Sequence, residues 1–392
     1  MRTVLVTGPG GAGRTTVAAA TALASARAGR RTLLVSADAV PGFPAGPAPT
    51  RVAEHLDHAR LDSAGHFRDE LLALQDRASG VLDLLGANRL DGEELTELPG
   101  STQFAALHAL RRAAEGDWSH GAYGTLVVDL PPLTEALALL ALPGQLRRYL
   151  RRLLPRERQA ARALRPLLAQ FAGVPMPAQW LYEAAARKDA ELAAVETLLA
   201  DSATTVRLVA EPGPAAEDAL RTARTGLALH GAGVEAVVAN RVLPRHSSDP
   251  WFAGLAAQQE KCLDHWHQEW APGTPVHQAA HLGRDPRGLR ELALDGVPAP
   301  DAREPGHAAP PWWTEDGGDG VLVWCLPLPG AVKEDLRLVR RGQELLIGAG
   351  PFHRIVPLEA ALRRCTVSGA ALADGVLRVR FTPDPALWPR SR

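Results

Sequence analysis

Cysteine, lysine and methionine are all scarce in this chain of 392 residues. The three cysteines, Cys262, Cys325 and Cys365, stand far apart, and no CxxC pair or Cys/His ligand spacing occurs. Such spacings mark zinc sites and disulfide frameworks, so the sequence predicts neither of them. Only three lysines are present, and arginine supplies almost all of the positive charge. An arginine where a lysine is usual can therefore reflect a general bias of the chain.

A charge excess and a long apolar run are also missing. The formal net charge is −1 and the isoelectric point is near 6.9, so we expect no nucleic-acid binding through a broadly basic surface. The longest apolar run, LALLALP after Glu135, is too short to span a bilayer. The start of the chain lacks the charged region and apolar core of a secretion signal. We expect a soluble, cytoplasmic protein with at most peripheral membrane contact.

Buried strands alternate with helices along most of the chain, which favours an α/β fold with a mostly parallel sheet. Leucine and valine at helical spacing fill 52–115 and 134–200, so a helical insertion is expected at about 60–115 and 140–200 of a domain spanning 1–295. The predicted strands are 2–7, 30–38, 124–132, 207–213 and 233–244, with a last strand or turn at 274–281. The predicted helices between them are 14–29, 217–231 and 251–270.

The composition and the hydrophobic pattern of the sequence change near residue 296. Residues 296–320 are rich in proline and glycine and predict a linker. Residues 321–385 show short alternating segments, with hairpin signals at Arg341-Gly342 and Asp374-Gly375. This region predicts a small all-β, sandwich-like domain.

The first predicted strand runs into a glycine-rich loop and then a helix. The loop reads Gly8-Pro9-Gly10-Gly11-Ala12-Gly13-Arg14-Thr15, close to the phosphate-binding pattern G-x-x-x-x-G-K-[ST] except for the arginine. Backbone N–H groups of such a turn, together with a helix N-terminus, bind phosphate. A tight strand-to-helix turn without a ligand is the alternative interpretation.

Several stretches together resemble the ArsA-type ATPases, which include the arsenite-efflux ATPase and the ATPase that targets tail-anchored membrane proteins. GPGGAGRTTVAAATA is similar to their GKGGVGKTT loop, and VSADAVPGF, DLPPLTEALALLALP and VVANRVLP are similar to their switch and adenine-side segments. LPLPGAVKEDLRLVRRGQELLI resembles the small heat-shock (α-crystallin-like) domain of some members. The resemblance implies a P-loop NTPase fold with ATP and Mg²⁺ as ligands.

The resemblance also assigns roles to residues of this sequence. It implies that Asp38 orients the attacking water, that Thr15 and Asp129 lie at Mg²⁺, and that Asn240 reads the adenine edge. An aspartate or asparagine that ends a strand is also a common turn former, so the alternative role for these residues is structural. The residues implied for nucleotide contact are Gly8, Gly10, Gly11, Ala12, Gly13, Arg14, Thr15, Thr16, Asp129 and Asn240.

Three departures from the family pattern bear on activity. Pro9 replaces the signature lysine that acts on the partner subunit's phosphates, and Arg14 replaces the lysine of the loop. Leu133-Thr134-Glu135 stands where the family has Thr-Gly-His. Because phosphoryl transfer depends on positioned positive charge, these changes predict weak hydrolysis at best.

Two functions remain open at this point. The first is a weak, ATP-binding ArsA-like ATPase, a nucleotide-controlled dimer that handles a protein or membrane-associated client. The second is a pseudo-ATPase that acts as a structural or regulatory scaffold, as a homodimer or with an ArsA-like paralogue. The cysteine cluster of arsenite binding is missing. The histidines His108, His120, His277 and His281 have no partner at metal spacing and are expected to be ordinary surface or packing residues.

Overall fold

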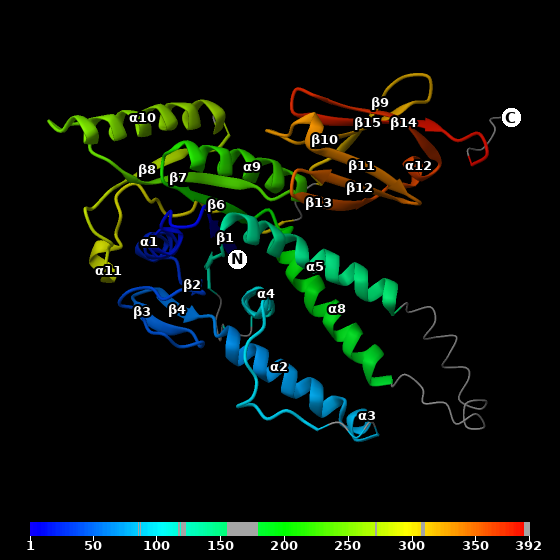
Figure 1. Ribbon diagram of the computed structural model, residues 1–392, viewed down its shortest axis with the longest axis horizontal. Helices are drawn as coiled ribbons and strands as arrows, with labels where there is room; N and C mark the ends of the chain where they lie inside the picture. Colours follow the sequence, from blue (N-terminus) through cyan, green and yellow to red (C-terminus); the bar gives the residue numbers. More distant parts are fainter. Residues whose placement is uncertain are drawn as a thin grey trace.

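An eight-stranded sheet forms the centre of the computed structural model (Figure 1), with strand order β3-β4-β2-β5-β1-β6-β7-β8. All neighbouring strands are parallel except β3, which is antiparallel to β4. The structure describes all residues except 85, 87, 117, 119–122, 155–178, 271–272, 307–309 and 388–392. The strands are β1 (Arg2–Thr7), β2 (Thr32–Ser36), β3 (Thr50–Ala53), β4 (Leu56–Arg60), β5 (Thr125–Asp129), β6 (Thr204–Ala210), β7 (Val234–Val242) and β8 (Val276–Ala280).

Helices cover both faces of the sheet because its strands are apolar on both sides, as parallel strands usually are. In β1, Val4 and Val6 pack with α1, whereas Leu5 between them packs on the opposite face. The second face is covered by α4, α5, α9 and α10. These helices are α1 (Arg14–Arg27), α4 (Ser101–Glu115), α5 (Leu133–Leu153), α9 (Pro214–His230) and α10 (Pro250–Trp270).

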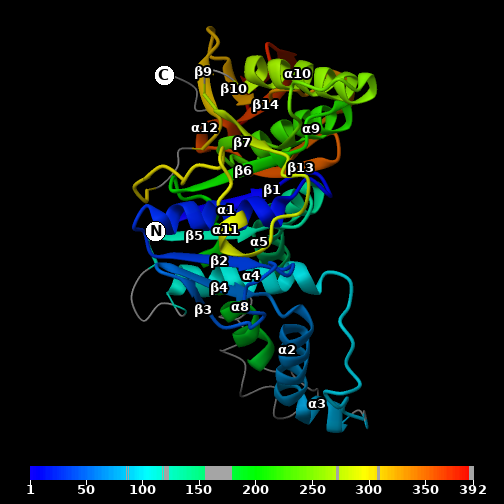
Figure 2. The ribbon, with the colours of Figure 1, turned by 90° about the vertical axis from the view of Figure 1, so that its left-hand side faces the viewer.

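Three further helices belong to the predicted insertion: α2 (Ser63–Arg77), α3 (Ser79–Leu84) and α8 (Gln179–Leu199). In Figure 2, α2 and α3 extend away from the sheet, at the end of the molecule opposite β9–β15. The helical insertion was predicted at about 60–115 and 140–200, and its part at 155–178 lies outside the described residues. None of the described helices is both long and apolar enough to cross a bilayer.

The prediction of helix from residue 52 is wrong at its start. Residues 50–60 form the hairpin β3–β4, which turns at His55 with a φ of 59°. β4 is buried because it pairs with β2, and Asp57 at its centre accepts hydrogen bonds from Tyr123 (2.8 Å) and Arg51 (2.5 Å). Tertiary pairing therefore overrides the local sequence pattern here.

The C-terminal region is antiparallel and all-β, as predicted. It has one sheet in the order β14-β15-β10-β9 and a second in the order β11-β12-β13. The strands are β9 (Trp313–Asp316), β10 (Leu322–Pro327), β11 (Leu336–Arg341), β12 (Glu344–Ala349), β13 (Phe352–Pro357), β14 (Cys365–Ala373) and β15 (Val376–Pro383). The short helices α11 (Gly288–Glu291) and α12 (Ala360–Arg363) and a 3-10 turn at Lys333–Asp335 complete the described elements.

Two details of this region differ from the sequence expectation. Trp313–Asp316 lies inside the stretch expected to be linker but forms β9. It does so because it pairs with β10, with Trp313 opposite Cys325. The turn between β11 and β12 is Gly342-Gln343, one residue later than the expected signal. The signal at Asp374-Gly375 is confirmed: both residues have positive φ, as a type I′ hairpin turn requires.

The β region packs directly on α9 and on the end of α5 (Figure 1). Arg354 of β13 donates a hydrogen bond to the carbonyl oxygen of Leu229 (2.6 Å), and its guanidinium lies 4.8 Å from the ring centre of Trp312. Glu344 of β12 forms ion pairs with Arg148 and Arg152 of α5. Apolar side chains of the sheet, of α5 and α9, and of the β region form one continuous core. The β region is therefore held against the α/β domain over a packed interface.

Candidate functional site

The glycine-rich loop connects β1 to α1 at the carboxyl ends of the parallel strands. Gly11 and Gly13 have φ values of 80° and 85°, which glycine adopts without a steric penalty. A Cβ at Gly8 would overlap the backbone carbonyl of Val209, and a Cβ at Gly13 would overlap the side-chain amide of Asn240. Gly13 is the N-cap of α1 and no side chain caps the helix there. The first N–H groups of α1 are thus available to an anion.

Thr15 and Asp129 meet at the centre of this edge. The Thr15 hydroxyl donates to Asp129 Oδ2 at 2.6 Å. Asp129 is only 4% exposed, and its second oxygen, Oδ1, is buried without a hydrogen-bond partner among the described residues. Burial raises the pKa of Asp129 to about 6, while the hydrogen bond from Thr15 and the charge of Arg14 lower it and Asp38 raises it. A buried carboxylate with a free oxygen beside a hydroxyl suits a divalent cation.

Arg14 and Asp38 approach the same place from neighbouring elements. The guanidinium of Arg14 donates to the carbonyl oxygen of Leu130, just after β5. The side chain of Asp38 is exposed, and its charge acts on Asp129. Ser36 fixes the turn after β2 by donating to the Asp38 carbonyl at 2.8 Å.

A cavity of about 260 Å³ opens beside the loop and is lined by Gly13, Thr16, Asn240, Arg241 and residues 280–286. The amide nitrogen of Asn240 donates to the Ala12 carbonyl at 2.9 Å, so this side chain both supports the loop and lines the cavity.

Family models match nearly the whole described chain. A model described as "Anion-transporting ATPase" matches residues 1–293, and one described as an HSP20-like domain found in ArsA matches residues 319–381. The chain belongs to the ArsA ATPase family. The mostly parallel sheet and the separate antiparallel β region are the two parts that these models describe.

Relatives of this ArsA-family protein cover its full length. An uncharacterized protein of Streptomyces coelicolor is 59% identical over all of both chains. A protein of Mycobacterium tuberculosis is 32% identical over 99% of this chain and 97% of its own. A protein of Aquifex aeolicus, provisionally named an arsenical pump-driving ATPase, is 25% identical over 93% of this chain and 95% of its own.

Sequence reasoning missed Arg241 in this ArsA-type site. Arg241 has a φ of 57°, an unfavourable conformation for a non-glycine residue. Its guanidinium donates to the Gly11 carbonyl at 3.0 Å and pairs with Asp285 at 3.3 Å and Glu211 at 3.5 Å. Its position next to Asn240 in the sequence was the available signal. His281 is exposed, as expected of a surface residue, and also lines the cavity, whereas His120 lies outside the described residues.

The start of α5, at Leu133-Thr134-Glu135, contacts the glycine-rich loop and α4. The N–H of Leu133 donates to the Gly8 carbonyl at 3.1 Å, which ties the start of α5 to the loop. Glu135 is exposed and accepts a 3.4 Å hydrogen bond from Gln103 of α4. Its negative charge is therefore directed to α4.

Proposed function

We propose that this protein binds ATP with Mg²⁺ in the site formed by residues 8–16, Asp129 and Asn240. The Thr15–Asp129 pair carries the proposal, because it leaves a buried carboxylate oxygen without a partner at the end of β5. Burying such a group costs free energy that a bound cation would recover. Membership of the ArsA ATPase family supports nucleotide as the ligand.

In this proposal, different residues of the site contact different parts of the Mg²⁺–ATP ligand. The N–H groups at the start of α1 and the glycines of the loop would hold the phosphates. Thr15 and Asp129 would hold Mg²⁺, which offsets phosphate charge when it is bound. Thr16, Asn240 and the 280–286 segment would enclose the ribose and base in the 260 Å³ cavity. Asp38 is exposed near Asp129 and is the residue we assign to orienting water.

We further propose that hydrolysis is slow. Arg14 is engaged with the Leu130 carbonyl, and Pro9 has neither a charge nor an N–H to offer to a partner's phosphates. An arginine that stabilises the transferred phosphoryl group is worth about 10³–10⁵ in rate in other enzymes. With one cation displaced and one missing, the site favours retention of nucleotide over turnover.

The proposed physiological role is a dimer whose state depends on nucleotide and which handles a protein or membrane-associated client. The α2–α3 part of the helical insertion and the β region lie at opposite ends of the α/β domain (Figure 1), and we propose these two parts as the ones that contact the client. The engagement of Arg14 by Leu130 also favours a second candidate, a pseudo-ATPase scaffold that binds nucleotide weakly or not at all.

Calorimetric titration with ATP and Mg²⁺ tests the proposal. We expect micromolar binding to the wild-type protein and a loss of about 100-fold or more in Gly13→Val, since valine at a φ of 85° is strained and its Cβ overlaps Asn240. Gly254→Ala is the matched control, because a Cβ at Gly254 of α10 would have nothing within 4 Å and Gly254 does not line the cavity. No binding to wild-type protein at millimolar nucleotide would exclude the ATP-binding role and leave the scaffold.

A further inference from the structure

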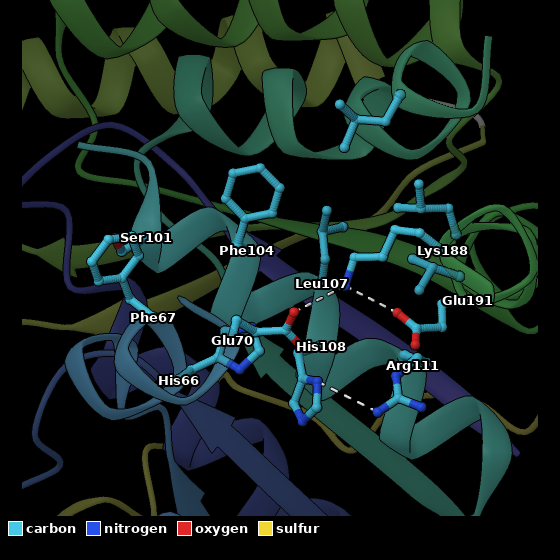
Figure 3. Close-up of a pocket in the computed structure, with 13 residues that line it drawn as sticks. His66, Phe67, Glu70, Ser101, Phe104, Leu107, His108, Arg111, Lys188 and Glu191 are labelled. Atoms are coloured by element: carbon cyan, nitrogen blue, oxygen red, sulfur yellow. Dashed lines mark hydrogen bonds and ion pairs between the residues drawn. The ribbon is translucent and has the colours of Figure 1, made fainter. Parts of the chain in front are cut away.

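A second cavity, of about 240 Å³, lies between helices of the insertion (Figure 3). Its apolar walls include Phe67, Phe104 and Leu107. Two histidines and a glutamate face one another at one side of it: His66 and Glu70 from α2, and His108 from α4. None of these three residues belongs to the nucleotide site.

The sequence spacing on α2 brings the first two ligands to one face. His66 and Glu70 are four residues apart, so their side chains project from neighbouring turns. α4 packs against α2 and adds His108, whose ring centre lies 4.4 Å from that of His66. One nitrogen or oxygen of each of the three side chains lies within 4.8 Å of the others. Donors around one first-row metal ion are about 3–4 Å apart, so small side-chain rotations would close the set.

The two cationic side chains near these three residues, Arg111 and Lys188, each form an ion pair with a glutamate. Arg111 lies 3.5 Å from His108 Nδ1 and forms an ion pair with Glu115 at 2.7 Å. Lys188 lies 3.8 Å from Glu70 and pairs more closely, at 3.0 Å, with Glu191. Both cations thus have another carboxylate, and Glu70 can exchange Lys188 for a different cation without leaving the ammonium unpaired.

Burial lowers the pKa of His66, and burial, the neighbouring His66 ring and the Arg111 guanidinium together lower the pKa of His108 to about 4. Neutral imidazole is the form that binds metals.

We propose that His66, Glu70 and His108 form a binding site for a divalent transition-metal ion, with Zn²⁺ as the expected occupant. Two imidazoles and one carboxylate suit Zn²⁺ and Co²⁺ better than Mg²⁺ or Ca²⁺, which prefer oxygen ligands. Three protein ligands leave at least one coordination position open toward the cavity. The ion would join α2 to α4 and would present that open position to a small ligand enclosed by the apolar walls.

Titration of the full-length protein with Co²⁺ tests this site, with excess Mg²⁺ present so that the Thr15–Asp129 pair does not contribute. We expect one Co²⁺ per chain, visible absorption bands of nitrogen and oxygen coordination, and displacement of Co²⁺ by Zn²⁺. His108→Gln should weaken binding by more than about 100-fold, since even second-shell substitutions at metal sites cost 10- to 100-fold.

Two further variants keep the result interpretable. Glu70→Gln should also lose the bands, and because this side chain is half exposed, the loss cannot be attributed to unfolding. The matched control is His246→Gln, which removes an exposed histidine from a loop and should bind Co²⁺ as the wild-type protein does. Unchanged binding in both His108→Gln and Glu70→Gln, or no stoichiometric Co²⁺ uptake by the wild-type protein, would overturn the proposal.

Discussion

Asp129→Asn is expected to stabilise the nucleotide-free protein and to abolish its Mg²⁺-dependent binding of ATP. The carboxyl group is 4% exposed, and burial raises its pKa from 3.8 to about 6. At neutral pH the protein therefore keeps a buried negative charge. The free-energy cost of burying this charge is offset when a cation binds. Asparagine retains an oxygen that can accept from Thr15 and has no charge.

The pH dependence follows from the direction of the shift. Folding raises the pKa of this acid, so between pH 4 and 6 the folded protein binds more protons than the unfolded chain. Stability therefore falls as the pH rises through this window, by about 3 kcal/mol at most for a shift of this size. The stabilisation by Asp129→Asn should be about 1–3 kcal/mol at pH 8 and close to zero at pH 4.

Urea unfolding at pH 8 and pH 4 in the presence of a chelator measures the stabilisation by Asp129→Asn. Calorimetry with ATP and Mg²⁺ measures the loss of ATP binding. Asp295→Asn, at an exposed position, serves as the control and should change stability by less than about 0.5 kcal/mol. If Asp129→Asn were less stable than the wild type at pH 8, the ionised Asp129 carboxylate would not destabilise the folded protein, contrary to this prediction.

Gly226→Leu should separate the β region from the α/β domain and cost about 3 kcal/mol of stability. Gly226 lies in the middle of α9, where leucine is normally the better helix former. Here a Cβ would lie 2.8 Å from the ring of Phe352 and 2.9 Å from a methyl group of Leu137. The larger side chain can be accommodated only if the Phe352 ring and the Leu137 side chain are displaced, and their displacement disrupts the shared core.

Thermal unfolding and limited proteolysis report this change. The variant should have a lower melting temperature, and the chain should become sensitive to cleavage between the α/β domain and the β region. Gly254→Leu is the matched control, since it places the same side chain in helix α10 where nothing lies within 4 Å. It should be neutral or stabilising by up to about 1 kcal/mol. Equal stability of the two variants would mean that the contact of Gly226 with Phe352 does not hold the β region in place.

The α/β architecture followed from the sequence because its strands are short apolar runs that end in glycine, aspartate or asparagine. The same logic failed at β3 and β4, because polar and apolar side chains are mixed in both strands, and β4 becomes a buried strand through its pairing with β2. The antiparallel β region was predictable from alternation and hairpin turns. Its docking on α9 was not, because Gly226 gives no sign in the sequence that an aromatic ring from another region will lie against it.

The candidate site shows the same division. The loop glycines and Thr15 follow the spacing of a phosphate-binding loop, and the resemblance to the ArsA-type ATPases implied that Asp129 lies beside Thr15. The position of Arg14 was not predictable, since its acceptor is the backbone carbonyl of Leu130, which any residue would provide. His66 and His108 are 42 residues apart on different helices, and only the packing of α2 against α4 brings their rings together.

Helix α5 has a mechanical consequence for the molecule. It begins at Leu133, which is hydrogen-bonded to the glycine-rich loop, and continues for 21 residues, about 30 Å, to the arginines that pair with Glu344. The helix therefore connects the glycine-rich loop directly to β12. We expect a displacement of the loop that shifts Leu133 to move the far end of this helix against the β region. By reciprocity, a partner that binds the β region and holds this end of the helix would change the affinity of the loop for the proposed nucleotide.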